Sequence, residues 1–442
     1  MKFPAEAGAP GEGTPVTPPV TIRHDSAPGK MVPSRTFIHW LSMKDPLRSS
    51  PAPASRLAQR LEAELAELSA AGLRRRRRVL ETPCGREVTV DGQELLNFAS
   101  NDYLGLAGDP RLAAALAEGA RRWGAGSGAS HLVSGHTQAH EDLEQALAAF
   151  TGFPRVLSFA TGYLANIAVT PTFAGRGDAV FADKLNHASL IDAMQLAKAH
   201  GAEVQRYAHN DVAALARLLE RSEARQKLIV TDAVFSMDGD LAPLNELFAL
   251  AEAHDAWLVI DDAHGFGVLG PHGEGSLAHC RLPYHPRLLL MGTLGKAAGV
   301  GGAFVAGSEI AIDYLLNSGR GYIFTTAAPP AVACALSASL RLIADGDALR
   351  ARLQAHIAQL RAGLAGLPWT LLPSETAIQP LIVGDNQAAL QLADALRQRG
   401  LWTPAIRPPT VPRGSARLRI SLSAAHTTED VERLISALKE LA

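Results

Sequence analysis

Polar side chains with catalytic potential follow five apolar runs in the middle of the chain, each where a strand is expected to end. Ligands in open α/β sheets bind beyond the carboxyl ends of the strands, so these residues are expected to share one site. The set combines a helix start, an acid, two histidines, two hydroxyls and a lysine: Gly162, Tyr163, His187, Ser236, Asp261, His264, Thr293 and Lys296.

One cofactor chemistry uses all of these groups together. Pyridoxal phosphate needs a lysine for its covalent attachment and an acid that keeps its pyridine nitrogen protonated, so that the ring accepts electrons. Lys296 is the candidate lysine and Asp261 the candidate acid. His187 would stack on the face of the ring. These three are the predicted catalytic residues.

The remaining candidates would hold the cofactor in place. Its phosphate suits the free amides of a helix N-terminus, which Gly162 and Tyr163 would supply. Thr293 would add a hydroxyl to the phosphate, and Ser236 and His264 would contact the oxygen on the ring. Each residue alone has a plain structural explanation, as a cap or a core side chain. The prediction therefore depends on their joint placement.

Three other motifs fail on their context. Gly265, Gly267 and Gly270 match a dinucleotide-binding fingerprint, but no long helix is expected after them and no acid follows about 20 residues on. Gly295-Lys296 lacks the Ser or Thr and the upstream glycine of a phosphate-binding loop. His136-x-x-x-His140 has the spacing of metal ligands, but Glu141 does not fit a zinc motif, so no metal is expected.

The elements around these residues predict a doubly wound α/β domain over 105–330, with helices between short apolar strands. Continuous apolar runs such as 257–260 suit parallel strands that are covered on both faces. Seven strands are expected, over 156–159, 179–182, 203–207, 228–232, 256–260, 287–292 and 302–306.

The rest of the chain divides into three further parts. Residues 1–42 are rich in proline and glycine without periodicity, which indicates a disordered extension. Residues 43–104 hold a helix over 54–71 and a hairpin, expected to pack with the C-terminal domain. Residues 331–442 form a small α+β domain, with helices over 331–344 and 347–365, strands over 369–372, 379–383, 402–406 and 417–422, and a last helix from Thr427.

Composition narrows the choice of partners and compartment. The formal net charge is -2, which argues against nucleic acid as a partner although five consecutive arginines occupy 74–78. A local anion site explains that run better. The longest uncharged stretch, 321–340, contains two prolines, so no membrane span is expected. Three scattered cysteines favour a reducing compartment, and a cytoplasmic location is predicted.

On these motifs the chain resembles the α-oxoamine synthases, which are fold-type-I enzymes of the aspartate aminotransferase type. The resemblance runs from about residue 55 to the C-terminus. It implies a large cofactor domain built on a seven-stranded, mostly parallel sheet, together with a small α+β domain. The segments that carry it are 100–106, 126–135, 234–240, 261–265, 295–296, 405–412 and 416–419.

The resemblance implies an acyltransferase that joins L-alanine to pimeloyl-CoA, or to pimeloyl-acyl-carrier protein, with loss of CO₂, in biotin biosynthesis. Other members of the family take glycine or serine with acetyl-, succinyl- or palmitoyl-CoA, and they remain alternatives. The resemblance also implies a homodimer with the active site at the subunit interface. Substrate contacts are implied for His187 and for Arg74, Asn101, Thr410 and Arg419, with the register within the arginine run open.

Overall fold

The computed structural model describes residues 55–442. The predicted extension over 1–42 and the start of the predicted segment 43–104 lie outside the described residues. The chain divides into two units, residues 1–66 and 67–442. The predicted helix over 54–71 is α2 (Arg56–Ala70), which begins in the first unit and ends in the second. The remaining description concerns the second unit.

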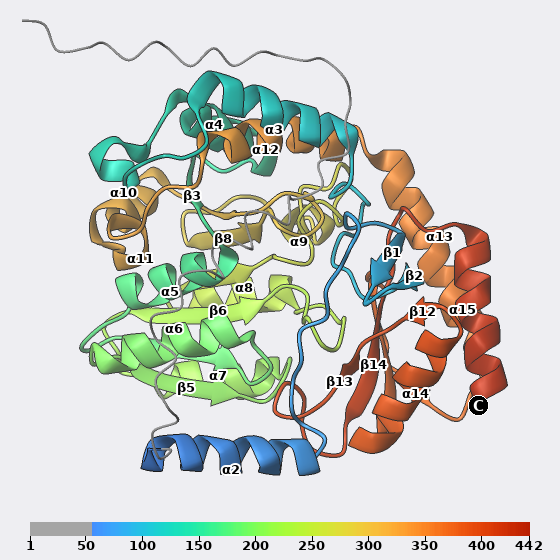
Figure 1. The fold of residues 1–442 in the computed structure, drawn as a ribbon. Coiled ribbons are helices and arrows are strands. Elements are labelled where there is room, and N and C mark those ends of the chain that lie inside the picture. Colours follow the sequence, from blue (N-terminus) through green and yellow to red (C-terminus); the bar gives the residue numbers. More distant parts are fainter. Residues whose placement is uncertain (1–54) are drawn as a thin grey trace, which may run out of the picture. The chain divides into compact units, whose positions relative to one another are not determined.

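A seven-stranded sheet forms the centre of this unit (Figure 1). The spatial order is β3-β9-β8-β7-β6-β4-β5, and only β9 runs antiparallel to its neighbours. All seven predicted strands are confirmed to within a residue at each end. They are β3 (Arg155–Phe159), β4 (Ala179–Asp183), β5 (Glu203–Tyr207), β6 (Lys227–Asp232), β7 (Ala256–Asp261), β8 (Leu288–Thr293) and β9 (Ala303–Gly307).

Both faces of the sheet are buried, because alternate side chains of each strand enter two separate apolar clusters. Leu258 and Ile260 join one cluster, and Val259 between them joins the other. The first face is covered by α4 (Gln138–Thr151), α7 (Val212–Glu220), α8 (Leu244–Ala253), α9 (Ser276–His279) and α12 (Pro330–Ala344). The second is covered by α5 (Gly162–Phe173), α6 (Ala188–Ala199), α10 (Glu309–Ser318) and α11 (Arg320–Ile323).

The C-terminal elements form two small sheets beside three helices (Figure 1). One sheet has the order β10-β11-β14-β13. In the other, the hairpin β1-β2 pairs through β2 with β12 in parallel. Their bounds are β1 (Glu87–Val90), β2 (Gln93–Asn97), β10 (Thr370–Leu371), β11 (Ile378–Gly384), β12 (Leu401–Trp402), β13 (Ala405–Ile406), β14 (Ala416–Ser421), α13 (Asp347–Gly363), α14 (Asn386–Gln398) and α15 (Thr428–Leu441).

Two features of this region differ from the sequence-based expectation. The single strand predicted over 402–406 is two short strands in different sheets, β12 and β13. The helix α14 was not predicted, although Asp385 caps its first amides. The helix α12 packs against α3 (Pro110–Trp123) and α4, on the side of the large sheet. The domain division at residue 330 therefore stays a prediction.

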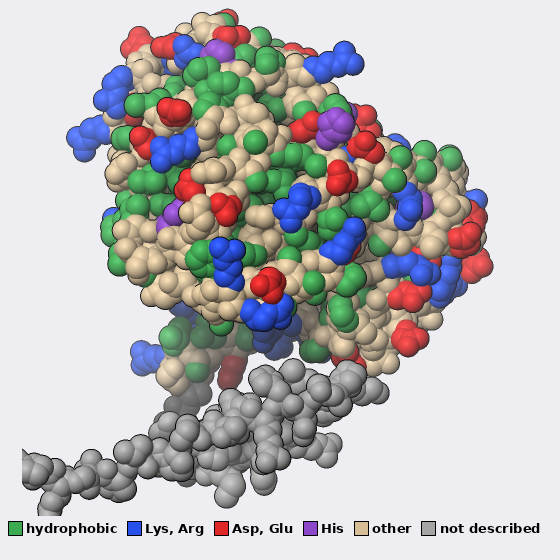
Figure 2. Space-filling view, turned by 90° about the horizontal axis from the view of Figure 1, so that it is seen from above, with side chains coloured by type: hydrophobic (Ala, Val, Ile, Leu, Met, Phe, Trp, Pro, Cys, Tyr) green, Lys and Arg blue, Asp and Glu red, His purple; other side chains and the backbone are tan. Residues whose placement is uncertain are grey.

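Surface charge and helix composition can be compared with the expectation that neither nucleic acid nor a membrane is a partner. Figure 2 shows basic and acidic side chains interspersed on one face of the molecule, without a wide area of one sign. Within residues 55–442, the structure contains no helix long and apolar enough to cross a membrane.

Candidate active site

Acidic and polar residues end four neighbouring strands at one edge of the large sheet. Asp232 of β6 lies in register with Asp261 of β7, and Asp183 and Thr293 end β4 and β8. These strands are parallel, so their carboxyl ends meet at this edge. The candidate residues of the following loops, from Ser236 to Lys296, are therefore carried to the same place.

Lys296 and His264 begin a chain of hydrogen bonds across the site. The Lys296 Nζ lies 2.9 Å from His264 Nε2, and His264 Nδ1 lies 2.6 Å from the Tyr103 hydroxyl. Tyr103 donates to Asn101 Oδ1 at 3.1 Å, and Arg419 Nη1 donates to the same oxygen at 3.0 Å. When Lys296 donates to Nε2, the ring proton of His264 is on Nδ1, facing Tyr103.

Burial controls the charge of both groups at the start of this chain. It lowers the pKa of Lys296 to about 8, against the opposing attraction of Asp261. Burial, together with the nearby cations Lys296 and Arg419, lowers the pKa of His264 well below its ordinary value. His264 is therefore neutral, and Lys296 has more free amine near neutral pH than an ordinary lysine.

Asp261 is held by two donors that leave it acceptor capacity. Its Oδ1 accepts from the Ala263 amide at 2.9 Å, and its Oδ2 accepts from Asn166 Nδ2 at 2.6 Å. The neighbouring Asp232 is fully buried, and burial beside Asp261 raises its pKa well above the ordinary range. Because two adjacent carboxyl groups do not both ionise easily in such a place, Asp232 is the neutral member of the pair.

His187 is the residue that precedes α6, and the structure fixes its orientation. Its amide donates to Asp232 Oδ2 at 2.7 Å. Its Nδ1 lies 2.7 Å from the hydroxyl of Ser189, which also accepts from Asn166 Nδ2 at 2.9 Å. Since Asn166 supplies a donor to Ser189, the Ser189 hydroxyl donates to Nδ1 and the proton of the neutral imidazole is on Nε2. Burial lowers the pKa of His187, which favours this neutral form.

The N-terminus of α5 lies beside the end of β8. Thr161 caps the helix by accepting from the Leu164 amide, so the amides of Gly162 and Tyr163 have no partner within the helix. A Cβ added to Gly162 would lie 3.6 Å from Thr293 Oγ1, which shows how close the two residues are. The side chain of Tyr163 points elsewhere, because its hydroxyl donates to Asp192.

Arg419 joins the small domain to the loop that follows β6. Its Nε donates to the carbonyl oxygen of Ser236 at 2.6 Å, and its Nη1 donates to Ser421 Oγ at 2.8 Å as well as to Asn101. Arg419 Nη2 makes only a 3.5 Å contact with the Tyr103 hydroxyl. This nitrogen is therefore the one best able to receive a substrate carboxylate.

The structure brings one arginine of the run 74–78 to Thr410, the other predicted acyl-substrate contact. Arg75, rather than Arg74, donates to Thr410 Oγ1, at 3.1 Å. Arg74 donates to Ser69 at 3.4 Å, near the end of α2. Arg407 lies close to Arg75, and burial together with that neighbouring cation lowers its pKa. Arg75 therefore lies beside Thr410, one residue beyond the predicted Arg74 and within the register left open by the sequence.

The donor set fits pyridoxal phosphate. A lysine with lowered pKa, an acid with open acceptor capacity, a neutral histidine and unpaired helix amides meet at one edge. Lys296, Asp261, His187 and the Gly162–Tyr163 turn would hold the group, with Thr293 beside the turn.

Sequence reasoning missed three residues of this site: Tyr103, Asn166 and Asp232. Asp232 ends a predicted strand and could have been added by the same rule that selected Asp261. Tyr103 contacts His264 across 161 positions of sequence, and Asn166 contacts Asp261 across 95. No local pattern indicates either contact.

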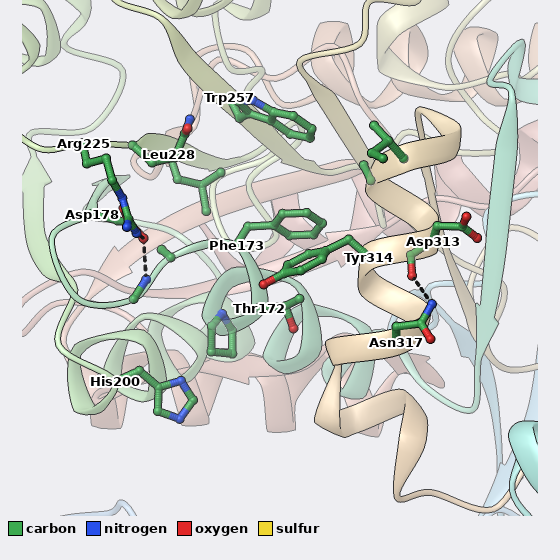
Figure 3. Close-up of a pocket in the computed structure, with 16 residues that line it drawn as sticks. Thr172, Phe173, Asp178, His200, Arg225, Leu228, Trp257, Asp313, Tyr314 and Asn317 are labelled. Atoms are coloured by element: carbon green, nitrogen blue, oxygen red, sulfur yellow. Dashed lines mark hydrogen bonds and ion pairs between the residues drawn. The ribbon is translucent and has the colours of Figure 1, made fainter.

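A cavity lies at the opposite, amino end of the same strands (Figure 3). This cavity has a volume of about 780 Å³ and contains the aromatic rings of Phe173, Trp257 and Tyr314. Phe173 stacks on Trp257 with the ring centroids 5.8 Å apart. Its buried acid, Asp178, is paired with Arg225 at 2.9 Å. The residues drawn do not include a lysine, and none of the predicted site residues lines the cavity.

Comparisons with curated proteins agree with this arrangement. The 8-amino-7-oxononanoate synthase of Dechloromonas aromatica is 76% identical over 382 residues, which cover 86% of this chain and 99% of that protein. The enzyme of the same name from Herminiimonas arsenicoxydans is 61% identical over 387 residues, covering 87% and 99%.

Solved structures show the same fold. Serine palmitoyltransferase from S. paucimobilis, solved with PLP and myriocin bound, is 31% identical with a TM-score of 0.81, covering 87% of this chain and 98% of that one. An 8-amino-7-oxononanoate synthase from Francisella tularensis is 30% identical with a TM-score of 0.68, covering 78% and 98%. These findings confirm the resemblance to the α-oxoamine synthases. Residues 93–438 match the class I and II aminotransferases, and the chain belongs to this family.

Proposed function

We propose that this chain is a pyridoxal-phosphate-dependent acyltransferase that condenses L-alanine with a pimeloyl thioester and releases CO₂. The product is 8-amino-7-oxononanoate, an intermediate of biotin biosynthesis. The observation that carries the proposal is the meeting of Lys296, Asp261 and His187 at one sheet edge, in a chain 76% identical to a synthase of that name.

The bound cofactor would supply an electron sink for negative charge that develops at the α-carbon of the amino acid. Asp261 would keep the pyridine nitrogen protonated, and the raised pKa of the neighbouring Asp232 keeps that second carboxyl group neutral. Asn166 would orient Asp261 through its 2.6 Å hydrogen bond. His187 would lie against the face of the ring, and Ser236 and His264 beside its oxygen.

Lys296 would take the proton from the α-carbon at Nζ. A general base works best when its pKa is close to the ambient pH, and burial lowers the pKa of this amine to about 8. His264 accepts a hydrogen bond from the same nitrogen and so directs it within the site. The Nε2–H of His187 would donate to the carbonyl oxygen next to the departing carboxylate.

Two arginine positions would recognise the two ends of the substrates. Arg419 would bind the amino-acid carboxylate through Nη2, next to Asn101. Thr410 and Arg75 would contact the acyl chain, with Arg74 as the neighbouring alternative. A guanidinium is well suited to the distal carboxylate of a pimeloyl group.

The proposal includes a homodimer with the active site at the subunit interface. The similarity to 8-amino-7-oxononanoate synthases and to serine palmitoyltransferase over nearly their whole length supports it. Light scattering of the purified protein would give twice the chain mass of 46.7 kDa if the proposal holds.

The test is release of CoA by the cofactor-loaded enzyme, measured with L-alanine, glycine and L-serine against pimeloyl-, acetyl-, succinyl- and palmitoyl-CoA. L-Alanine with pimeloyl-CoA is expected to give the highest kcat/KM. Turnover confined to glycine or serine with another thioester would instead assign glycine C-acetyltransferase, 5-aminolevulinate synthase or serine palmitoyltransferase activity. A parallel assay with pimeloyl-acyl-carrier protein decides between the two carriers.

A further inference from the structure

Metal-ligating side chains gather at the start of α4, outside the site described above. His136 precedes the helix, and Glu141 and Glu144 lie one turn apart on it. One ligand atom from each of these three residues lies within 4.8 Å of the other two. Residues three positions apart on a helix share a face, so both carboxylates point to the same side.

His136 is oriented as a metal ligand would be. Its Nε2 lies 3.2 Å from Glu141 Oε2, and its Nδ1 lies 3.0 Å from Nδ1 of the buried His131. Two imidazole nitrogens at this distance share one proton. Without an ion, the Nε2–H of His136 donates to Glu141. A metal ion would displace that proton, His136 would then donate from Nδ1 to His131, and the Nε2 lone pair would be directed at the ion between the carboxylates. A second group that fixes the tautomer in this way is typical of ligating histidines.

Glu144 is a buried carboxylate, and one of its two oxygens accepts hydrogen bonds. Its Oε1 accepts from both the amide and the hydroxyl of Ser158, at 2.8 and 2.6 Å. These bonds hold the carboxylate rigidly between α4 and β3. No hydrogen bond to Oε2 is found among the described residues, so this oxygen is available to a cation.

His140 is not part of the group, although its spacing from His136 suggests a ligand pair. Its Nδ1 contacts the amide and hydroxyl of Thr137, and its Nε2 lies 2.8 Å from the Ala328 carbonyl oxygen. Both ring nitrogens are therefore engaged. The sequence analysis weighed His136, His140 and Glu141 against a zinc motif and did not consider Glu144.

A cavity gives access to the group. It has a volume of about 590 Å³ and is lined by His131, His136, Glu141 and Glu144, among others. Arg155, which also lines it, is paired with Asp313, so part of its charge is offset. The cavity has room for an ion and for water molecules that complete its coordination.

We propose that His136 Nε2 and the carboxylates of Glu141 and Glu144 bind one divalent transition-metal ion, with water as a further ligand. One imidazole and two carboxylates suit Zn²⁺ and its first-row neighbours, and the two carboxylates balance the charge of the ion. The ion would tie the segment 131–136 to α4 and, through Glu144 and Ser158, to β3. Its role would be structural, separate from the reaction at Lys296.

The test is a zinc titration of the cofactor-loaded, untagged enzyme after removal of metals by a chelator. A competing chromophoric chelator reports the stoichiometry and Kd. One Zn²⁺ per chain is expected, and the ion should raise the Tm. His136→Gln and Glu141→Gln should each weaken binding by about tenfold or more. Asp142→Asn, which removes an exposed carboxylate from the same turn of α4, should leave the Kd unchanged.

Two results would overturn the proposal. One is the absence of stoichiometric Zn²⁺ binding by wild-type enzyme that retains its cofactor absorbance and its Tm. The other is binding that is equally strong in wild type, in both ligand variants and in Asp142→Asn, which would place the ion elsewhere. Either result would leave the proposed enzymatic reaction unaffected, because CoA release is measured without added metal.

Discussion

The two ends of the large sheet are built from the same strands but differ in chemistry. At the carboxyl end, Asp232, Asp261 and Lys296 are buried or half-buried and interact electrostatically, with pKa shifts at Asp232 and Lys296. At the amino end, an aromatic cavity is open and its buried acid, Asp178, is neutralised by Arg225 (Figure 3).

The difference indicates that the carboxyl end of the sheet is the functional end, whereas the residues at the amino end contribute to stability. Burying ionisable groups without a matching counter-charge destabilises a fold, so such groups mark sites that chemistry requires. The ion pair and the stacked aromatic rings at the amino end are stabilising in themselves, so they do not indicate a catalytic function. The volume of a cavity is therefore a poorer guide to the active site here than the electrostatics of its lining.

The largest contrast is expected between Lys296, in the segment after β8, and Lys227, the first residue of β6. Lys296→Ala should reduce CoA release by at least about a thousandfold and remove the visible absorbance of the bound cofactor, because it deletes both the attachment point and the base. Lys227→Ala, at the amino end of β6, should keep both within about twofold. Steady-state kinetics and absorbance spectra measure the two outcomes. Equal losses of activity in the two variants would contradict the specific role assigned to Lys296.

A matched pair of aspartates gives the next contrast. Asp261→Asn should lower kcat/KM by about a hundredfold or more with little change in Tm, because the amide cannot hold the pyridine proton. Asp178→Asn should leave kcat/KM nearly unchanged and cost about 1 kcal/mol of stability, since its partner Arg225 is largely exposed. Steady-state kinetics and thermal unfolding of both variants measure these changes in kcat/KM and in stability. A silent Asp261→Asn would contradict the assigned role.

Tyr103→Phe tests the hydrogen-bond chain that runs from Lys296 to Arg419. The variant removes the hydroxyl that contacts His264 Nδ1 and Asn101. We expect kcat to fall by about tenfold and the basic limb of its pH profile to move, because the orientation of His264 is no longer fixed. A fall in kcat with an unmoved pH profile would indicate a purely structural tyrosine.

His209 is a charged group at the carboxyl end that is paired with two carboxylates, Asp183 and Asp240. Burial opposes its charge, but hydrogen bonds to Asp183 and Asp240 raise its pKa to about 10. The ordinary value is 6.5, so the stabilisation is fully present below pH 6.5 and is lost as the pH rises toward 10.

His209→Gln should therefore destabilise the protein by about 2 kcal/mol at pH 6, and by less at pH 9 to 10. Thermal unfolding of wild type and variant across this pH range measures the difference, and kcat/KM at pH 7 should change by less than about threefold. A difference in stability that grows with pH would contradict the raised pKa of His209.

Strands and helices were predicted correctly from the sequence where burial produces a local pattern of apolar residues. The run Trp257–Ile260 is apolar throughout because both faces of β7 are covered, and this made the strand and the acid after it visible. The same reasoning missed α14, although its buried residues Ala389, Leu392 and Leu396 recur at helical spacing and Asp385 caps its start. It also merged β12 and β13, because two-residue strands have no periodicity.

The parts of the site that sequence reading missed depend on tertiary contacts. Tyr103 reaches His264 from a segment near the start of the chain, and Arg75 reaches Thr410 across 335 positions. Within the run 74–78 each arginine has similar neighbours in sequence, so only the path of the backbone selects one of them. The Glu144 carboxylate was overlooked because its burial comes from packing against Ser158 on β3.

The central claim is that the chemistry resides at the carboxyl end of the sheet, on Lys296. Borohydride reduction of the cofactor-loaded enzyme fixes the cofactor to its lysine, and peptide mass spectrometry then locates it. We predict that the label is on the peptide that contains Lys296 and is absent from those with Lys184, Lys198 and Lys227. A label on another lysine, or no label on enzyme that releases CoA from pimeloyl-CoA, would contradict the account.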